Sequence, residues 1–434
     1  MPEPLTDRIR RIARPLTADP DLDPLIDRIG DARIVMLGEA SHGTSEYYTW
    51  RDRISRRLIA DHGFSFLAVE GDWPDCYRVN RFVRGFAGTD ADAHEVLHAF
   101  ERWPTWLWAN EEVASLVKWL RGHNDTMAPD RQAGFYGLDV YSLWDSMHAV
   151  LEYLERIDPD AATTARRAYG CFDPYHDDAQ RYAMATALVP TSCEDEAVAI
   201  LRALRARAPQ YREDGRESYF DAEQNALVAR NAELYYRTMI RGGPDSWNVR
   251  DRHMAETLER LLAHHGPDAR AIVWEHNTHI GDARATDMAA AGMTNIGRIA
   301  REQYGPRAVV LVGFAGYEGS VIAGSGWGEP MERMPVPPAR SGSWEALLHN
   351  TIGDDLLILT HELDGAAGAD EPRDHRAIGV VYHPARERFG NYVPTILPAR
   401  YDVFIHLETT SALRPLHMPV RVDGEVPETY PTGQ

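Results

Sequence analysis

Residues 33–43 read RIVMLGEASHG, an apolar run that passes directly into a polar segment. Continuous rather than alternating apolarity is typical of a strand that is covered on both faces. Trp50, Ile54 and Leu58 then recur at helical spacing, which predicts a helix after the polar segment. A buried strand followed by a helix is the unit from which layered α/β folds are built.

The same pattern recurs along the chain. Short apolar runs predict strands at Arg33–Leu37, Phe64–Val69, Gly134–Leu138, Ala269–Trp274, Ala308–Phe314, Ala377–Tyr382 and Asp402–His406. Helical patterns separate many of these runs. In the one around Ile296 and Ile299, Thr294 is placed to cap the start of the helix and Gly305 to end it. We therefore predict an α/β fold with a mostly parallel sheet flanked by helices.

The pattern changes between residues 143 and 266, where helical periodicity continues without a convincing strand. We interpret this segment as a helical insertion that forms a lobe over one edge of the sheet and over the active-site cleft. The chain would then consist of a first part of the α/β core, residues 1–142, the lobe, residues 143–266, and a second part of the core, residues 267–434. Glycine and proline concentrate between Gly313 and Gly342, which predicts a long loop.

The 434-residue chain has 46 Lys and Arg against 66 Asp and Glu, a formal net charge of −20. Such a charge argues against nucleic acids and anionic membranes as partners. The longest apolar run, around Ala308–Ala315, is far shorter than the roughly 20 residues of a membrane-spanning helix. The sequence therefore favours a small-molecule partner and leaves the oligomeric state undetermined.

Three cysteines, Cys76, Cys171 and Cys193, are too few for a disulfide framework and include no Cys-x-x-Cys pair. A reducing compartment is the simplest setting for them. The N-terminus has helical spacing at Leu5 and Ile9 but no apolar centre of a secretory signal. We therefore predict a cytoplasmic protein.

Polar side chains follow four of the predicted strands at their carboxyl ends. They are Glu39 and His42 after the first run, Glu70 after the second, Asp139 after the third, and His276 and His279 after the fourth. In open α/β sheets, ligands bind beyond the carboxyl ends of the strands. Polar residues end most strands, but four endings so rich in Glu, Asp and His predict one shared cleft.

His42 is the candidate general base. Thr44 or Ser45 is placed to cap the next helix, so His42 lies just before a helix N-terminus, where the dipole lowers the pKa of an imidazole. A neutral histidine with a carboxylate on its other nitrogen, from Glu39 or Glu70, has the usual arrangement of a general base. The alternative is a histidine that only caps the helix or packs in the turn.

Arg51 shares a helical stripe with Ile54, which would turn its side chain toward the sheet. A buried guanidinium needs carboxylate partners, and Glu39 and Glu70 are the candidates. If a stripe through Trp50 defines the buried face instead, Arg51 is an ordinary exposed arginine.

The same histidines and carboxylates offer ligands for zinc or manganese, but a His-x-x-His pair on a loop has loose spacing. We therefore predict no metal and no other cofactor, and we keep a metal-dependent hydrolase as an alternative. The chain has no Gly-x-Ser-x-Gly elbow for a nucleophilic serine and no Gly-x-Gly-x-x-Gly loop after a strand.

Trp103, Trp106 and Trp108 lie within six residues. Aromatic side chains line most ligand pockets, so we predict that Trp106 and Trp108 contact the substrate, together with Asp139 at its strand end. The alternative for the tryptophans is core packing.

The segment Gly38-Glu39-Ala40-Ser41-His42-Gly43-Thr44 resembles the signature of the erythromycin esterase family. The further parts that match in order are Arg51, Glu70, Trp106, Trp108, Asn110 and Glu111, and the stretches Phe135–Asp139, Trp274–His279 and Asp402–His406. The resemblance spans nearly the whole chain. It implies an α/β core with a helical lobe and a deep cleft, and hydrolysis of macrolide lactones without a covalent enzyme intermediate. It also implies His42 as the general base, with Glu39, Arg51, Glu70, His276 and His279 around the same cleft.

We therefore predict a hydrolase that cleaves a carboxylic ester or a macrolide-type lactone with a water molecule activated by His42. His276, His279 or Arg51 would stabilise the developing oxyanion or the leaving alkoxide. Besides the metal-dependent hydrolase, the other alternative is a non-catalytic protein that holds a hydrophobic natural product in the cleft.

Overall fold

A large β-sheet runs through the middle of the computed structural model, which describes residues 2–175, 179–188, 192–213, 215–240 and 242–417. Its strands, in the order in which they lie side by side, are β1 (Arg14–Pro15), β8 (Leu356–Leu359), β11 (Val403–Thr410), β6 (Val309–Gly324), β2 (Ile34–Leu37), β5 (Ala271–Trp274), β3 (Phe66–Asp72) and β4 (Gly134–Asp139), and β7 (Met331–Val336) pairs with β6. From β11 to β4 every neighbouring pair is parallel. The predicted α/β fold with a mostly parallel sheet is confirmed.

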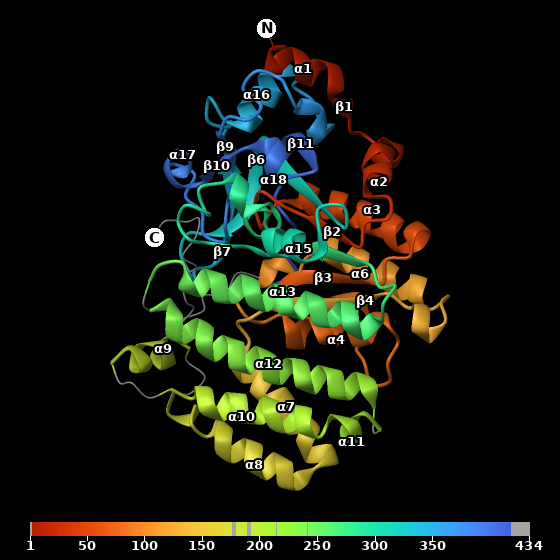
Figure 1. Cartoon of the computed structure of the whole chain (residues 1–434), viewed down its shortest axis with the longest axis vertical. Helices are drawn as coiled ribbons and strands as arrows, with labels where there is room; N and C mark the ends of the chain where they lie inside the picture. The colour runs from red at the N-terminus through yellow and green to blue at the C-terminus, as the bar shows by residue number, and fades with distance from the viewer. Residues whose placement is uncertain (1, 176–178, 189–191, 214, 241, 418–434) are drawn as a thin grey trace.

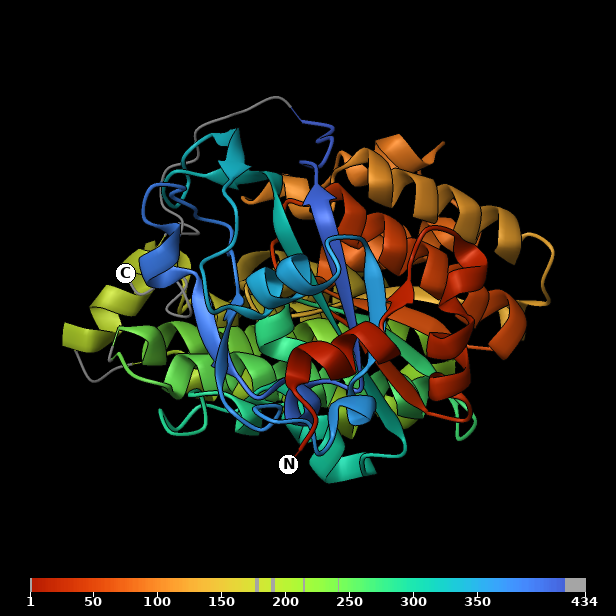
Figure 2. The ribbon, with the colours of Figure 1, turned by 90° about the horizontal axis from the view of Figure 1, so that it is seen from above.

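Helices cover both faces of this sheet, as Figure 1 and the perpendicular view of Figure 2 show. Those on one face are α2 (Asp23–Ile29), α3 (Ser45–His62) and α6 (Glu111–Asn124), and those on the other face are α1 (Leu5–Ile12), α13 (Asp245–His265), α15 (Ile296–Tyr304) and α16 (Trp344–Thr351). In β2, Val35 and Leu37 point into the first layer and Ile34 and Met36 into the second. This two-sided burial explains why the strand is apolar throughout.

The remaining elements are shorter or lie at the edges. They are α4 (Trp73–Val83), α5 (Ala93–Leu97), α14 (Asn277–Ile280), α17 (Glu387–Gly390), α18 (Leu397–Arg400) and a separate two-stranded sheet of β9 (Arg373–Arg376) and β10 (Tyr392–Thr395). Of these, α14 matters most for function because it directly follows β5.

The segment between β4 and β5 is helical in all its described elements. They are α7 (Leu143–Ile157), α8 (Pro159–Tyr169), α9 (Ala179–Leu188), α10 (Glu194–Ala206), α11 (Ala208–Glu213), α12 (Arg216–Met239) and α13. Most of these helices share a hydrophobic core of their own, and α13 packs against the sheet (Figure 1). The division of the chain into core and lobe at residues 142 and 266 stays a prediction.

The second half of the chain departs from the sequence-based expectations in two places. The predicted loop at 313–342 is largely a hairpin, because β6 continues to Gly324 and pairs antiparallel with β7. Glycine serves close backbone packing there, since a Cβ on Gly319 would lie 2.0 Å from the backbone oxygen of Thr410. The predicted strand Ala377–Tyr382 is wrong, because this buried run makes only isolated bridges, to Ser41 and Gly324.

The start of α15 also differs from the prediction. Asn295, rather than Thr294, caps this helix, and its side-chain oxygen accepts the backbone N–H of Arg298. Gly305 ends the helix as expected. Asparagine and threonine are both good N-cap residues, so the sequence alone does not show which of the two neighbours begins the helix.

Cys171 and Cys193 form a disulfide within the helical insertion, whereas Cys76 is a buried free thiol. The pairing removes the argument for a reducing compartment that was drawn from the cysteines, and a cytoplasmic location stays a prediction. No helix in the described part of the chain combines the length and the apolarity that crossing a membrane requires.

Candidate active site

The polar residues predicted to meet lie at the carboxyl ends of four adjacent strands. Glu39 and His42 follow β2, His276 and His279 follow β5, Glu70 lies in β3 and Asp139 ends β4. Because β2, β5, β3 and β4 are parallel neighbours, their ends meet at one edge of the sheet. Contacts join all six side chains, directly or through one neighbour, so the structure brings these residues together at one edge of the sheet.

A buried chain of contacts orients His42. Arg51 on α3 donates from Nη2 to Glu39 Oε2 at 2.6 Å, and Glu39 Oε1 lies 2.9 Å from Nδ1 of His42. The guanidinium also lies over the rings of Tyr48 and Trp274, at 4.3 and 4.6 Å from their centroids. Arg51 is fully buried, which confirms the inward-facing prediction and rejects the exposed alternative.

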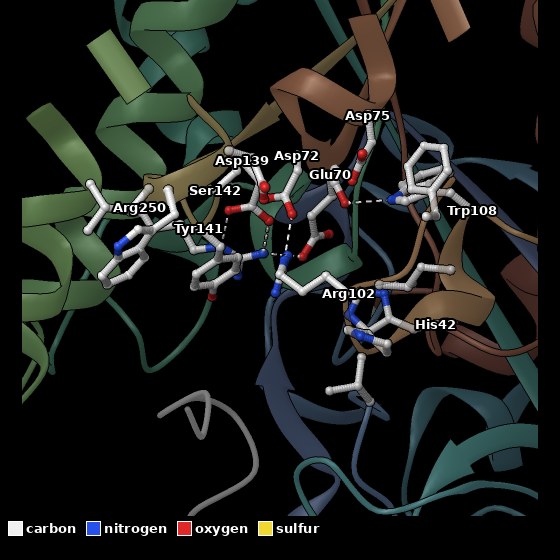
Figure 3. Close-up of a pocket in the computed structure, with 18 of the residues that line it drawn as sticks. His42, Glu70, Asp72, Asp75, Arg102, Trp108, Asp139, Tyr141, Ser142 and Arg250 are labelled. Carbon is white, nitrogen blue, oxygen red and sulfur yellow. Dashed lines mark hydrogen bonds and ion pairs between the residues drawn. The ribbon is translucent and has the colours of Figure 1, made fainter. Parts of the chain in front are cut away.

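This chain fixes the tautomer of His42. A carboxylate only accepts, so Nδ1 of His42 donates to Glu39, and in the neutral form of the ring Nε2 carries the lone pair. Thr44 occupies the N-cap position of α3, although its side chain makes no capping bond to the helix. The His42 side chain is 5% exposed and forms part of a cavity wall (Figure 3). The arrangement is therefore that of a positioned general base.

Arg250 on α13 joins two of the strand-end carboxylates. Its Nη2 donates to Glu70 at 2.7 Å and to Asp139 at 2.8 Å, and its Nε donates to the second oxygen of Asp139 at 2.9 Å. The second oxygen of Glu70 accepts the backbone N–H of His276 at 2.8 Å. All these groups are buried. The fork-shaped guanidinium thereby clamps the ends of β3 and β4 together.

The same contacts set the protonation of the two carboxylates. Burial by itself raises the pKa of Glu70, but the positive charges of His279 and Arg250 outweigh it and hold the pKa well below its usual range. Burial by itself also raises the pKa of Asp139, but the charge and the hydrogen bonds of Arg250 outweigh burial, so the pKa of Asp139 is lowered as well. Both side chains are therefore ionised at neutral pH.

His279 is held behind Arg250. Its Nδ1 lies 3.0 Å from Asp251, and its ring stacks on Trp247 with 4.4 Å between centroids. Nε2 is 2.9 Å from Nη1 of Arg250. Burial by itself lowers the pKa of His279, but the carboxylates of Asp251 and Glu70 outweigh burial and raise the pKa above its usual value.

His276 caps a short helix and also lies beside His42. Its Nδ1 accepts the backbone N–H of Thr278 at 3.3 Å and so caps α14. Its ring centroid lies 4.9 Å from that of His42. Burial and the nearby His42 hold the pKa of His276 well below its usual value. His276 is therefore a neutral neighbour of His42.

A cavity of about 280 Å³ opens beside this network (Figure 3). Four members of the network line it, His42, Glu70, Asp139 and Arg250. The apolar side chains of its wall are Phe100, Pro104, Leu107, Trp108, Leu143, Trp144, Trp327 and Val380. The charged ones outside the network are Asp72, Asp75, Arg102 and Asp145, with His148 and the polar Tyr141, Ser142 and Tyr236 nearby.

Acidic side chains dominate the charged part of the wall. Arg102 donates to Asp72 at 2.5 Å and so neutralises one of them. Burial raises the pKa of Asp75 to about 7, and the neighbouring Asp72 and Asp145 add to the shift. A cavity with this wall favours neutral or cationic ligands over anionic ones.

The predicted site residues divide into three groups. His42, Glu70, Asp139 and Trp108 line the cavity. Glu39, Arg51, His276 and His279 lie in the network but do not line the cavity. Trp106 belongs to the hydrophobic core, fully buried against Trp103, so the core-packing alternative describes it better than the pocket prediction.

Arg250 and Asp251 were missed from the sequence. Arg250 lies four residues before Met254 and Asp251 lies seven before Leu258, on the apolar stripe of α13 that faces the sheet. Two adjacent charged residues on an apolar stripe are the signal that would have revealed them.

The described ranges contain no group of three or more His, Cys, Asp or Glu side chains with an arrangement that would hold a metal ion. Glu39 is engaged by Arg51, and Glu70 and Asp139 by Arg250. Arginines thus engage these three carboxylates, which are candidate ligands for a metal.

The sheet, the cavity at its carboxyl edge and the oriented histidine are the features of an α/β enzyme. The family model described as erythromycin esterase matches residues 59–410, and the chain belongs to the erythromycin esterase family. The resemblance seen in the sequence is confirmed.

Individual relatives are distant. A type II erythromycin esterase from Escherichia coli is 25% identical over 278 residues, which are 60% of this chain and 63% of that enzyme, so the match spans less than two thirds of it. The crystal structure of a succinoglycan biosynthesis protein has a TM-score of 0.78 at 21% identity, over 94% of this chain and 97% of that one. A mutant of the erythromycin esterase EreC in its open conformation has a TM-score of 0.67 at 17% identity, with the same coverage. The two solved structures show the shared fold.

Proposed function

We propose that this protein hydrolyses a carboxylic ester or lactone with a water molecule activated by His42. The observation that carries the proposal is the buried chain from Arg51 through Glu39 to His42, which holds the imidazole in the wall of the cavity. General-base assistance of this kind contributes about 10²–10⁴ in rate. Glu39 acts through His42 and is therefore a positioning residue.

The reaction proceeds in two steps. Nε2 of His42 takes a proton from water as the water oxygen attacks the carbonyl carbon, and the carbonyl oxygen becomes an oxyanion. The bond from this carbon to the alcohol oxygen then breaks, and His42 returns its proton to the leaving alkoxide. The products are an alcohol and a carboxylic acid, which releases its remaining proton to solvent and becomes a carboxylate; both groups are in one molecule if the substrate is a lactone.

Arg250 is the cation best placed to stabilise the oxyanion, because it lines the cavity whereas Arg51, His276 and His279 do not. One well-positioned donor of this kind is worth about 3–4 kcal/mol in the transition state. In this proposal Arg250 stabilises the oxyanion in place of His276, His279 or Arg51. These three residues instead help to hold Arg250 and His42 in position.

The cavity narrows the choice of substrate. About 280 Å³ is at the lower end of the volumes of ligand pockets, so a small ester fits entirely and a macrolide-type lactone fits only in part. The acidic wall disfavours substrates that carry a carboxylate near the ester. The substrate expected on these grounds is a neutral or amine-bearing ester or lactone with an apolar side.

A substrate panel tests the proposal. We expect mass spectrometry to detect the addition of one water to a macrolide, a small lactone or a neutral ester, and no addition to a matched ester carrying a carboxylate. In ¹⁸O-labelled water the label should enter the new carboxylate. A ligand that binds and is recovered intact after long incubation would support the non-catalytic alternative instead.

Hydrolysis is expected to survive thorough chelation and dialysis, because arginines already occupy the carboxylates of the site. The measurement is the rate on a substrate from the panel before and after chelator treatment, with a buffer-dialysed sample as the control. Activity that is lost to the chelator and restored by zinc or manganese, but not by buffer, would establish the metal-dependent alternative.

A further inference from the structure

Glu275 is a buried carboxyl group of the network that the reaction above does not use. It lies between the end of β5 and His276, and it is 1% exposed. Neither of its carboxyl oxygens has a hydrogen-bond partner among the described residues. The other four carboxylates of the network, Glu39, Glu70, Asp139 and Asp251, each contact an arginine or a histidine.

The backbone around Glu275 leaves it little freedom to find a partner. The N–H of His276 donates to Glu70, and the N–H of Asn277 donates to the backbone oxygen of Glu39 at 2.9 Å. These bonds tie the two residues after Glu275 to the ends of β3 and β2. The side chain is therefore fixed inside the site by its neighbours in sequence.

The charged groups that act on Glu275 come from three elements. They are Glu70 on β3, Asp139 on β4, and Arg250 and Asp251 on α13. Three of these are carboxylates, and Arg250 already donates to two of them, Glu70 and Asp139. A negative charge on Glu275 would thus be buried beside like charges without a cation of its own, which is a strongly unfavourable arrangement.

Electrostatics and burial agree with this geometry. Burial raises the pKa of Glu275 well above its ordinary value, and Glu70 and Asp251 add to the shift. Burial without a partner therefore favours the neutral carboxylic acid over the carboxylate at Glu275.

We propose that Glu275 carries a proton in the active enzyme, and that its ionisation at alkaline pH stops hydrolysis. An ionised Glu275 would add a negative charge beside Glu70, Asp139 and Asp251 and would weaken the positive potential of Arg250, which the oxyanion needs. Glu275 thus acts on the reaction through the charge balance around Arg250. The catalytic part of this inference rests on the proposed function, whereas the protonation state does not.

A stability measurement tests the protonation state without any substrate. Glutamine resembles a neutral carboxylic acid in shape but cannot ionise, so Glu275→Gln mimics the protonated side chain. In the unfolded chain the pKa of a glutamate side chain is about 4.3. Above this pH the unfolded chain has released the proton of Glu275, so the wild-type protein must take up a proton when it folds. Its folding equilibrium therefore weakens by about tenfold per pH unit relative to the variant, up to the folded pKa.

We expect the melting temperatures of the wild type and Glu275→Gln to be closest near pH 4.5, with the variant increasingly favoured up to pH 8. Glu70→Gln is the matched control with the opposite sign, because the pKa of Glu70 is lowered and its charge stabilises the fold at neutral pH. Glu275→Met, which also cannot ionise, should reproduce the trend if the amide is not tolerated. A difference that is independent of pH, or that turns against Glu275→Gln as pH rises, would overturn the assignment.

The catalytic part is tested by the pH profile of kcat/KM on a substrate from the panel. The decline of activity at alkaline pH should move to higher pH by at least one unit in Glu275→Gln. The same decline in both proteins, or a correctly folded variant that is inactive at every pH, would overturn it. Failure to find any substrate would leave the stability result intact and would count against the proposed function alone.

Discussion

Replacing His42 with asparagine is expected to lower kcat by about 10²–10⁴-fold with little change in KM. Asparagine can still donate a hydrogen bond to Glu39, but it cannot take a proton from water near neutral pH. Glu39 keeps its bond to Arg51 in the variant, so no buried charge is left without a partner. The cost in folding free energy should therefore be about 1 kcal/mol or less. Steady-state kinetics on a substrate from the panel and thermal unfolding measure the two effects separately.

His361→Asn provides the control, because His361 is exposed and lies outside the cavity wall. It should behave as the wild type in both measurements. If His42→Asn retains more than about a tenth of the native rate, His42 contributes less than roughly 1.4 kcal/mol to the barrier. The general base would then have to be sought elsewhere, first at Glu70 and His279.

Replacing Arg250 with methionine is expected to be the most damaging single change to both folding and activity. The substitution leaves Glu70 and Asp139 buried without their shared cation, and breaking a buried pair in this way costs about 3–5 kcal/mol. It also removes the only arginine of the network that lines the cavity in the described structure. We expect kcat/KM to fall by at least about 10²-fold, the loss typical of one oxyanion donor.

The stability loss of Arg250→Met should depend on pH. In the wild type, Arg250 helps to hold the pKa values of Glu70 and Asp139 below their usual range. Charges held in this way stabilise the fold above the unfolded-state pKa values of about 4, and their contribution disappears as pH falls and they bind protons. Urea unfolding at several pH values should therefore show a large deficit at pH 7 that persists to about pH 4 and narrows only as pH falls below it.

Arg260→Met on the same helix is the matched control. Arg260 pairs with Glu223 at 3.1 Å but is partly exposed, so its loss should cost about 1 kcal/mol or less. Equal losses of stability and activity in the two variants would show that Arg250 stabilises α13 in general and has no specific role in the active site. Arg250→Lys keeps the charge without the fork, and it should recover part of the stability but little of the activity.

The central strands could be predicted from the sequence because burial on both faces makes their residues apolar throughout. The same reasoning located the polar residues that follow these strands, since parallel strands end at one edge. It failed at Ala377–Tyr382, where an apolar run is buried without pairing as a strand. Apolarity reports burial, and burial alone does not distinguish a strand from a covering segment.

Side chains on helices were harder to place. Trp106 and Trp108 are two residues apart, yet one is in the core and the other lines the cavity, because a short 3₁₀ turn, Thr105–Leu107, separates their directions. The apolar stripe of α13 indicates that Arg250 faces the sheet, but which strand ends its guanidinium reaches depends on how the helix is placed and rotated against the sheet. That rotation is set by tertiary packing, which the local pattern does not contain.

Two helices of the insertion contribute to the site in different ways. The first turn of α7 supplies Trp144 and Asp145 to the cavity wall, whereas α13 supplies Arg250, which is bonded to two strand ends. An engineer who wishes to redirect this enzyme toward other esters would therefore build libraries in α7 and leave α13 unchanged. By the same logic, natural variants can diverge in what they accept through α7 while their chemistry stays the same.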